Sequence, residues 1–191
     1  TFLLYLHDTP ILYINMKRKL TFLTALLITA GSAMAQGSPL WLRKNDISPD
    51  GTKIAFTYKG NIYTVPTEGG RAYQLTSNQS HDSDPMWSPE GKSIIFSSYR
   101  EKSKDIYKVS AEGGKPVRLT SHPGNETPLT VLEDGSVVFS ANIQQDAQYG
   151  DFPGGSQVYR TGPDGGRPEL VTSLQIADMS VAPDGTVIYE D

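Results

Sequence analysis

Short runs of alternating apolar and polar residues recur along the chain, separated by residues that favour turns. The clearest copy extends from Asp84 to Thr120, with runs at 84–88, 93–98, 105–109 and 117–120. Side chains of a β-strand point alternately to its two faces, so each run predicts a strand. Pro89-Glu90-Gly91 and Gly113-Gly114 supply turn chemistry between runs. Four antiparallel strands within about 40 residues are typical of a β-propeller blade.

The same unit occurs before and after this copy. The acidic residue that precedes each turn glycine is at positions 50, 90, 134 and 184, so successive copies are 40, 44 and 50 residues apart. Propeller blades repeat with periods of this size. The longest step reflects a surface loop over residues 142–156, rich in Gln, Asp, Gly and Pro.

We therefore predict an all-β fold: a partial β-propeller with three complete four-stranded antiparallel blades and the start of a fourth, preceded by a signal-peptide helix. The incomplete propeller covers 36–191, with blades at about 41–80, 81–124, 125–174 and, truncated, 175–191. Trp41-Leu42-Arg43 is either the first strand or a strand that closes the ring. Because closure normally needs at least four blades, we expect the sequence to be a fragment cut in its fourth blade.

Apolar residues within the repeats predict the contacts between neighbouring blades. Trp87 is expected at a seam between two blades. The other residues expected to pack between blades are Ile54, Phe56, Ile94, Phe96, Val138 and Tyr189.

Residues 16–35 have the features of a secretory signal peptide. Met16–Lys19 is basic, Leu20–Ala30 is apolar, and Ala33-Met34-Ala35 provides the small residues of a cleavage site after Ala35. A core helix or membrane anchor is the alternative, but a membrane-spanning helix needs about 20 apolar residues. Residues 1–15 fit neither pattern and are interpreted as untranslated or misassigned leader. The mature protein is expected to be exported and to have no stable membrane insertion.

Composition excludes several classes of function. The formal net charge is -4, from 17 basic and 21 acidic residues, which gives no electrostatic footprint for nucleic acid. The chain has no cysteine, so disulfides, thiolate metal sites and cysteine nucleophiles are excluded.

Two groups of polar residues are candidates for functional sites. His81, Asp82 and Asp84 are conceivable as a metal site or catalytic pair, but nothing fixes a third ligand, so a polar loop between blades is favoured. A similar polar group occurs at the equivalent place in the loop after the second blade. It is either part of a rim surface that contacts a ligand or another domain, or a solvated loop. We favour the solvated loop. This second group consists of His122, Asn125 and Glu126.

The remaining candidates recur at blade turns. Ser48, Ser88 and Ser180 lack the Gly-x-Ser-x-Gly surroundings of a nucleophile elbow, and Asp134 and Asp184 are turn carboxylates. The Gly-Gly pairs are not followed by the lysine and helix of a phosphate loop. We therefore predict no catalytic, cofactor-binding or metal-binding residues and no cofactor.

Ser-Pro-Asp-Gly-x-x-Ile-x-Phe, followed by Ile-Tyr, Gly-Gly and Leu-Thr, resembles the WD40-like repeat of TolB and tricorn protease propellers. More closely, Pro39–Asp191 resembles the N-terminal propeller of exported tricorn-like serine peptidases of the tail-specific (C-terminal processing) protease family in Gram-negative bacteria. The segments that carry this resemblance are Trp41-Leu42-Arg43, Gly124–Pro128 and Gly165–Leu170.

The resemblance implies a non-catalytic propeller that gates or binds peptides and unfolded proteins for proteolysis in the periplasm. Its partners would be the PDZ and protease domains of the same chain, beyond the residues present here, and no catalytic residue carries over. A TolB-like periplasmic protein-binding propeller and the propeller of a prolyl oligopeptidase-type peptidase are the alternatives. Total blade number, substrate sequence and oligomeric state do not follow from this sequence.

Overall fold

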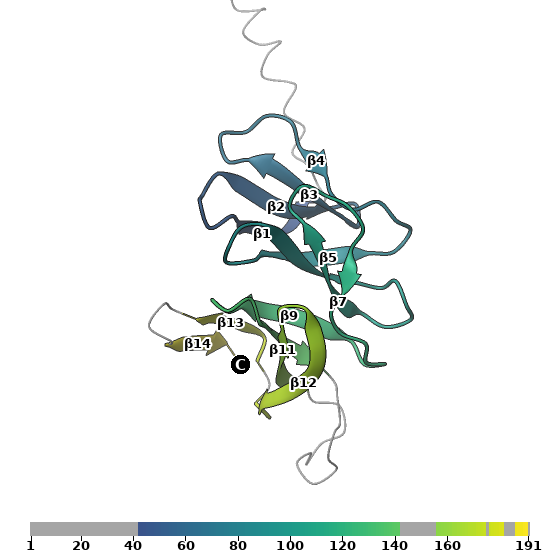
Figure 1. Ribbon diagram of the computed structural model, residues 1–191, viewed down its shortest axis with the longest axis vertical. Helices are drawn as coiled ribbons and strands as arrows, with labels where there is room; N and C mark the ends of the chain where they lie inside the picture. The colour runs from purple at the N-terminus through teal and green to yellow at the C-terminus, as the bar shows by residue number, and fades with distance from the viewer. Residues whose placement is uncertain (1–41, 142–155, 175, 182–185, 191) are drawn as a thin grey trace, which may run out of the picture. The chain divides into compact units, whose positions relative to one another are not determined.

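Strands β1 to β14 form three four-stranded antiparallel sheets and one two-stranded sheet (Figure 1). This computed structural model describes residues 42–141, 156–174, 176–181 and 186–190. No helix occurs among these residues, and so none that is long and apolar enough to cross a membrane. The predicted signal peptide, the leader, Trp41 and most of the 142–156 loop lie outside them.

Each sheet is built from one copy of the repeat, with its strands in chain order. The first sheet holds β1 (Leu42–Ile47), β2 (Lys53–Tyr58), β3 (Asn61–Pro66) and β4 (Tyr73–Gln74). The second holds β5 (Asp82–Trp87), β6 (Ser93–Ser98), β7 (Asp105–Ser110) and β8 (Val117–Arg118). The third holds β9 (Glu126–Val131), β10 (Val137–Ala141), β11 (Gln157–Gly162) and β12 (Gly165–Thr172), and the fourth holds β13 (Asp178–Val181) and β14 (Val187–Glu190).

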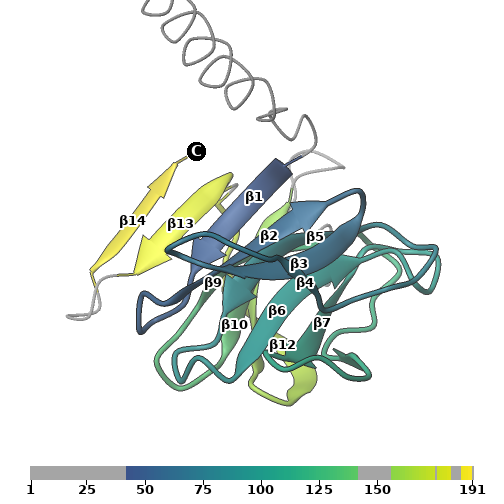
Figure 2. The same cartoon turned by 90° about the horizontal axis from the view of Figure 1, so that it is seen from above.

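Because strands pair within a copy and not between distant copies, the predicted fold class is confirmed. Leu42 and Arg43 belong to β1, which pairs with β2, so this segment is the first strand of the first blade. Figure 2 shows the same sheets from above, with β13 and β14 at the end of the series.

The acid-glycine turns join the first two strands of each complete blade. Gly91 has φ 68°, and its N–H donates to the Ser88 carbonyl at 2.8 Å. The Ser88 hydroxyl accepts from the Ser93 N–H at 3.0 Å, as the Ser48 hydroxyl accepts from Lys53 at 2.9 Å. These two serines therefore close turns, as predicted. The corresponding turn at 183–185, including Asp184, lies outside the described residues.

An aromatic pair marks the centre of every complete blade. Phenylalanine from the second strand stacks on tyrosine from the third, with ring centroids 5.7 to 6.0 Å apart. The pairs are Phe56–Tyr63, Phe96–Tyr107 and Phe139–Tyr159. Residues from neighbouring blades complete each buried cluster; Trp87 packs with Ala55 and Ile62 of the first blade, which confirms its predicted place.

Most of the predicted inter-blade residues are buried, but Tyr189 is not. Phe56, Ile94, Phe96 and Val138 are buried and Ile54 is half-buried. The prediction for Tyr189 is wrong, because its side chain is 52% exposed. Its strand, β14, pairs only with β13 among the described residues, and no third strand covers the ring.

Candidate functional site

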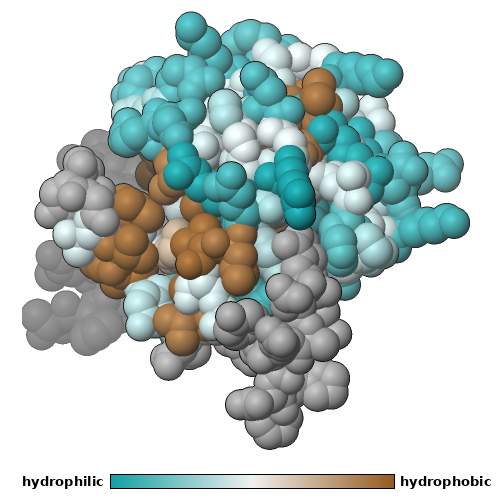
Figure 3. Space-filling view, turned by 60° about the horizontal axis from the view of Figure 1, so that its bottom comes forward, coloured by the Kyte–Doolittle hydropathy of each residue, from teal (hydrophilic) through white to brown (hydrophobic). Residues whose placement is uncertain are grey.

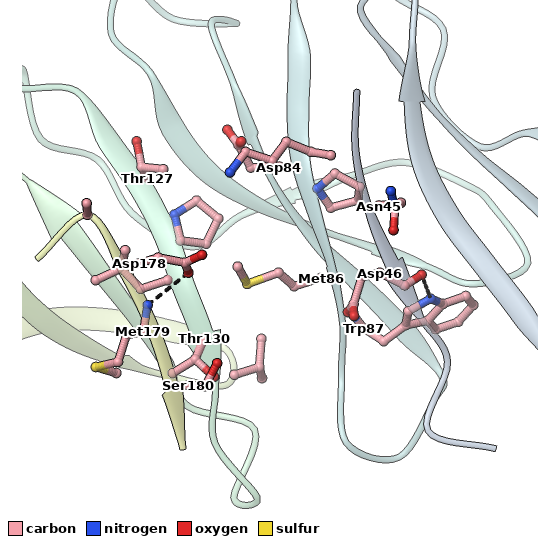
Figure 4. Close-up of a pocket in the computed structure, with 16 residues that line it drawn as sticks. Asn45, Asp46, Asp84, Met86, Trp87, Thr127, Thr130, Asp178, Met179 and Ser180 are labelled. Atoms are coloured by element: carbon pink, nitrogen blue, oxygen red, sulfur yellow. Dashed lines mark hydrogen bonds between the residues drawn. The ribbon is translucent and has the colours of Figure 1, made fainter. Parts of the chain in front are cut away.

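The first strands of the four sheets surround one cavity. β1 contacts β5, β5 contacts β9, and β9 contacts β13, so these strands form a continuous inner wall. The cavity has a volume of about 490 Å³. Its lining comes from residues 44–46, 84–87, 127–131 and 177–180 (Figure 4).

β-bulges direct two charged side chains towards this cavity. The pairing of β1 with β2 is irregular between Arg43 and Asn45, and that of β5 with β6 between Ser83 and Met86. At these irregularities Lys44 has φ 43° and Asp84 has φ 54°. A left-handed conformation costs a non-glycine residue about 1–2 kcal/mol, and bulges commonly redirect a side chain beside a functional site. Lys44 and Asp84 therefore occupy the same strained position in successive blades.

Asp84 is held by a network at the edge of the cavity. Lys104 Nζ donates to Asp84 Oδ2 at 2.9 Å and to Thr127 Oγ1 at 3.1 Å. Ser83 Oγ also donates to Asp84 Oδ2, at 2.8 Å. Because Lys104 comes from the loop between β6 and β7, its ammonium joins the second blade to the third.

The electrostatic surroundings keep Asp84 charged. Burial raises the pKa of the Asp84 carboxyl, but the hydrogen bond and positive charge of Lys104 act against burial. The Ser83 hydroxyl and the Lys44 ammonium act in the same direction as Lys104, so the pKa lies below its ordinary value. Asp84 is therefore ionised at neutral pH.

The remaining wall combines carboxylates, hydroxyls and methionine. Asp178 Oδ1 accepts from the Met179 N–H at 2.9 Å, and Thr130 and Ser180 present hydroxyls beside Met86 (Figure 4). The lining residues include no histidine and no cysteine. This wall can bind a polypeptide through hydrogen bonds, ion pairs and apolar contacts, but it does not pair a nucleophile with a base.

The first predicted group does not converge on one point. His81 is exposed and lies against Gly60, whereas Asp84 faces the cavity. Asp82 is fully buried, so the expectation of a polar loop is wrong for this residue. Its carboxylate accepts from Ser98 Oγ at 2.5 Å and from Arg100 at 3.0 Å. These donors, with Asn78 at 2.8 Å, satisfy the buried charge and make Asp82 structural.

The second group is also divided between surface and interior. His122 Nδ1 accepts from the Gly124 N–H at 3.0 Å, and Asn125 Oδ1 accepts from the Lys104 N–H at 3.1 Å, so both order the loop. The expectation of a solvated loop is wrong for Glu126, which is the first residue of β9 and fully buried. The main-chain N–H of Glu126 donates to the Lys104 carbonyl at 2.7 Å, which joins the start of β9 to the loop before β7 in the second blade.

Glu126 has fewer donors than Asp82, its counterpart in the preceding blade. Its carboxyl accepts a short hydrogen bond from the Thr120 hydroxyl. Burial raises the pKa of Glu126 to about 7, opposed by the Thr120 hydrogen bond and reinforced by the negative charge of buried Asp105. Arg118 lowers this pKa, but its guanidinium pairs directly with Asp105 at 2.8 Å.

The sequence interpretation missed Lys44, Lys104 and Asp178. A signal was present, because Lys44, Asp84 and Asp178 each lie seven residues before a turn glycine of the repeat. Lys104 has no such signal, since it reaches Asp84 and Thr127 from the loop between β6 and β7.

Among the described residues, no group of three or more histidine, cysteine, aspartate or glutamate side chains could hold a metal ion.

The prediction that Asp134 is a turn carboxylate is confirmed, since its Oδ1 accepts from the Ser136 N–H at 3.0 Å. Ser180 is not at a turn: it lies on β13 and lines the cavity.

Comparison with known proteins agrees with this architecture. The profile of the tricorn protease N-terminal beta propeller domain matches residues 39–191. The chain belongs to this family. Within this tricorn-type propeller, 58 residues are 31% identical to Tricorn protease homolog 1 of Streptomyces coelicolor, covering 30% of this chain and 5% of that protein.

Solved structures share the fold of the tricorn-type propeller. The tricorn protease superimposes with a TM-score of 0.64 and 20% identity, covering 78% of this chain and 15% of that chain. TolB from Acinetobacter baumannii superimposes with a TM-score of 0.57 and 25% identity, covering 74% of this chain and 35% of that chain. The chain spans a tenth or less of the length of the curated relatives it matches.

Proposed function

We propose that this tricorn-type propeller binds extended peptide segments in the cavity between its first strands and steers them to a serine peptidase. The single observation that carries the proposal is the cavity of about 490 Å³ whose wall presents charged groups from strained bulges. Strained residues cluster at functional sites more often than elsewhere.

The chemistry of the wall supports an extended polypeptide as the ligand. Such a segment offers main-chain N–H donors and carbonyl acceptors along its whole length. Asp84 and Asp178 can accept from N–H groups, and Lys44 can donate to a carbonyl. Met86 supplies an adaptable apolar contact for varied side chains. A wall of this composition suits binding with little dependence on sequence.

A peptidase role is supported by the family, whose description and relatives name the tricorn protease. We place the catalytic residues outside this chain, because the cavity wall carries no nucleophile with a base. We also propose export to the periplasm of a Gram-negative bacterium, supported by the signal-peptide features of residues 16–35 and cleavage after Ala35.

Fluorescence anisotropy with a labelled, unstructured 12-residue peptide tests the binding site. We expect saturable binding that Lys44→Ala and Asp84→Asn each weaken about tenfold, the effect of about 1.4 kcal/mol. Lys115→Ala and Glu68→Gln change similar charges at exposed positions away from the cavity and serve as controls. Equal affinities for all variants, or no binding, would contradict the proposal. Peptide hydrolysis by the pure chain would contradict the proposal that the catalytic residues lie outside it.

A protein-binding propeller without a peptidase is the second candidate, supported by the likeness to TolB. It predicts that the cavity variants leave peptide binding unchanged while a folded partner protein binds elsewhere on the surface.

A further inference from the structure

The junction between the second and third blades is closed by a lysine. Lys108 on β7 reaches the turn between β11 and β12, where its Nζ donates to the Pro163 carbonyl at 2.6 Å and to Asp164 Oδ1 at 2.8 Å. Gly165, the next residue of this turn, lies so near the second blade that a Cβ there would be 2.6 Å from the Leu119 carbonyl oxygen. A lysine side chain and close packing therefore fill this junction.

The junction between the first and second blades has the same parts without the lysine. Counted from the first residues of β3 and β7, Thr64 takes the place of Lys108. In the turns that follow β7 and β11, Glu112 takes the place of Asp164. A Cβ at Gly113, the next residue of the turn, would meet nothing within 4 Å. The first junction is therefore open at the place where the second is closed.

A groove with a volume of about 290 Å³ occupies the open junction, and we name it the seam groove. Leu75 is half-buried in its wall, whereas its counterpart in the closed junction, Leu119, is 4% exposed. Both blades of this junction are complete. The lining consists of Lys53 with residues 64–66 and 73–75 of the first blade, and of residues 111–112 of the second.

The carboxylate of the seam groove is weakly paired. Lys53 Nζ lies 3.4 Å from Glu112 Oε1, compared with 2.8 Å between Lys108 and Asp164. The Lys53 and Glu112 side chains are 45% and 85% exposed, and exposed ion pairs of this kind contribute little free energy. A cation that also gains apolar contacts in the groove can therefore displace Lys53.

We propose that the seam groove binds the side chain of a lysine from a partner polypeptide. The ammonium would donate to the Glu112 carboxylate and the Ala111 carbonyl, which correspond to the two acceptors that Lys108 uses one blade later. The partner would thus supply from outside the lysine that the first blade lacks at Thr64.

The rest of the seam groove suits the aliphatic stem of a lysine. Val65 and Leu75 are half-buried in its wall, and the side chain of Tyr73 is 59% exposed beside them. Lysine buries its methylene groups along apolar surface while its ammonium stays hydrated. An ammonium near an exposed aromatic ring also gains a cation–π contact. One side chain can therefore use both the apolar wall and the carboxylate.

Charge favours a lysine-bearing polypeptide over other ligands. Among the described residues that line the groove, only Glu112 carries a carboxylate, so the second ammonium of a diamine would have no anionic partner there. The formal net charge of the chain is -4, and hydrophilic side chains cover most of the upper part of the face shown in Figure 3. Such a protein attracts basic segments and repels acidic ones.

Amide NMR spectra of the isotope-labelled 191-residue chain, titrated with acetyl-Gly-Lys-Gly-amide, test the proposal. We expect saturable shifts of the amides of residues 64–65, 73–75 and 111–113. A matched peptide with norleucine keeps the stem but lacks the ammonium, and it should bind about fivefold more weakly.

Three variants of the chain identify the groups involved. Glu112→Gln should weaken binding of the lysine peptide about fivefold, because it removes the anionic acceptor. Lys53→Ala should strengthen binding about twofold, because it removes a competing ammonium. Thr64→Lys should abolish binding, since it supplies the lysine that β7 has at position 108. Circular dichroism shows whether this last variant is folded, and the two exposed substitutions decide the question without it.

Glu68→Gln is the matched control, because Glu68 is the corresponding acid in the exposed turn of the first blade and does not line the groove. Equal binding of the lysine and norleucine peptides, or equal effects of Glu112→Gln and Glu68→Gln, would overturn the proposal. Weaker binding in Lys53→Ala would also overturn it, since the groove would then select an anion. Tighter binding of 1,5-diaminopentane than of the peptide would make a polyamine the ligand instead. None of these variants lies in the cavity, which the Lys44 and Asp84 variants test separately.

Discussion

The carboxylate of Asp46 accepts a hydrogen bond from the main-chain N–H of Trp87 at 2.7 Å, and the Asp46 carbonyl accepts a second from the Trp87 indole at 3.2 Å. These two bonds join β1 to β5 along the wall of the cavity. The irregular pairing of β1 with β2 lies immediately before this point, between Arg43 and Asn45. The same contact therefore fixes both the first seam between blades and one side of the candidate site.

Replacing Asp46 should loosen this seam. Asp46→Ala removes a charge-assisted acceptor from the Trp87 N–H, a loss of about 1–3 kcal/mol in the free energy of unfolding. Thermal unfolding followed by circular dichroism measures the change. Glu68→Ala, an exposed carboxylate in a turn of the same blade, is the control and should melt with the parent protein. Equal melting of both variants would show that the Asp46 contact contributes nothing to stability.

Arg100 should contribute more to the free energy of unfolding than its position in a loop indicates. It pairs with fully buried Asp82 at 3.0 Å and lies over the rings of Phe96 and Tyr107, at 5.6 and 5.2 Å. Arg100→Ala leaves a buried carboxylate without its cation, which typically costs about 3–5 kcal/mol.

The control for Arg100 is Arg71→Ala. Arg71 lies 5.9 Å from the ring of Tyr73, but both residues are exposed, so this substitution should cost about 1 kcal/mol or less. Urea unfolding of the two variants measures the difference. A loss at Arg100 no greater than that at Arg71 would mean that Asp82 is satisfied without it.

Stability should depend on pH through Glu126. Its pKa is about 7 in the folded protein, above the ordinary value of 4.5. A carboxyl whose pKa is raised by folding stabilises the protein fully below pH 4.5 and loses that contribution as the pH rises through 7. The free energy of unfolding should therefore fall between about pH 5 and pH 8.

Glu126→Gln should flatten this dependence, because the amide fills the same space without a proton to lose. Glu90→Gln, at an exposed turn, is the matched control and should retain the parent slope. Urea unfolding at a series of pH values gives the slopes. A Glu126→Gln variant with the parent slope would show that another group titrates in this range.

Two glycines with the same backbone conformation should respond differently to alanine. Gly113 has φ 87° and Gly165 has φ 86°. A Cβ at Gly113 would meet nothing within 4 Å, so Gly113→Ala carries only the conformational penalty of about 1–2 kcal/mol. A Cβ at Gly165 would lie 2.6 Å from the Leu119 carbonyl oxygen in the neighbouring blade. Gly165→Ala should therefore have the lower melting temperature, and equal values would place the two blades further apart than described.

The repeats made the four sheets predictable from the sequence. The burial and hydrogen-bond partners of polar side chains between the sheets were harder to predict. Turns such as that at Gly91 and alternating strands such as β3 follow from local physics, and both agree with the sequence. Asp82 and Glu126 were misjudged because carboxylates beside turn residues ordinarily face water. Their burial depends on donors such as Arg100 and Thr120, which come from other strands and loops. Tyr189 was misjudged because its burial needs a strand beside β14, and among the described residues β14 pairs only with β13.

The outermost strands also have a consequence for solubility. β4 and β8 are two residues long, so each presents few unpaired main-chain groups to solvent. β12 has eight residues, but Pro168 lies within it and has no N–H to donate. Short or interrupted borders give a neighbouring molecule little to pair with, which is how natural sheets resist fibril formation. The periphery of these blades is therefore protected against aggregation by its brevity and by one proline.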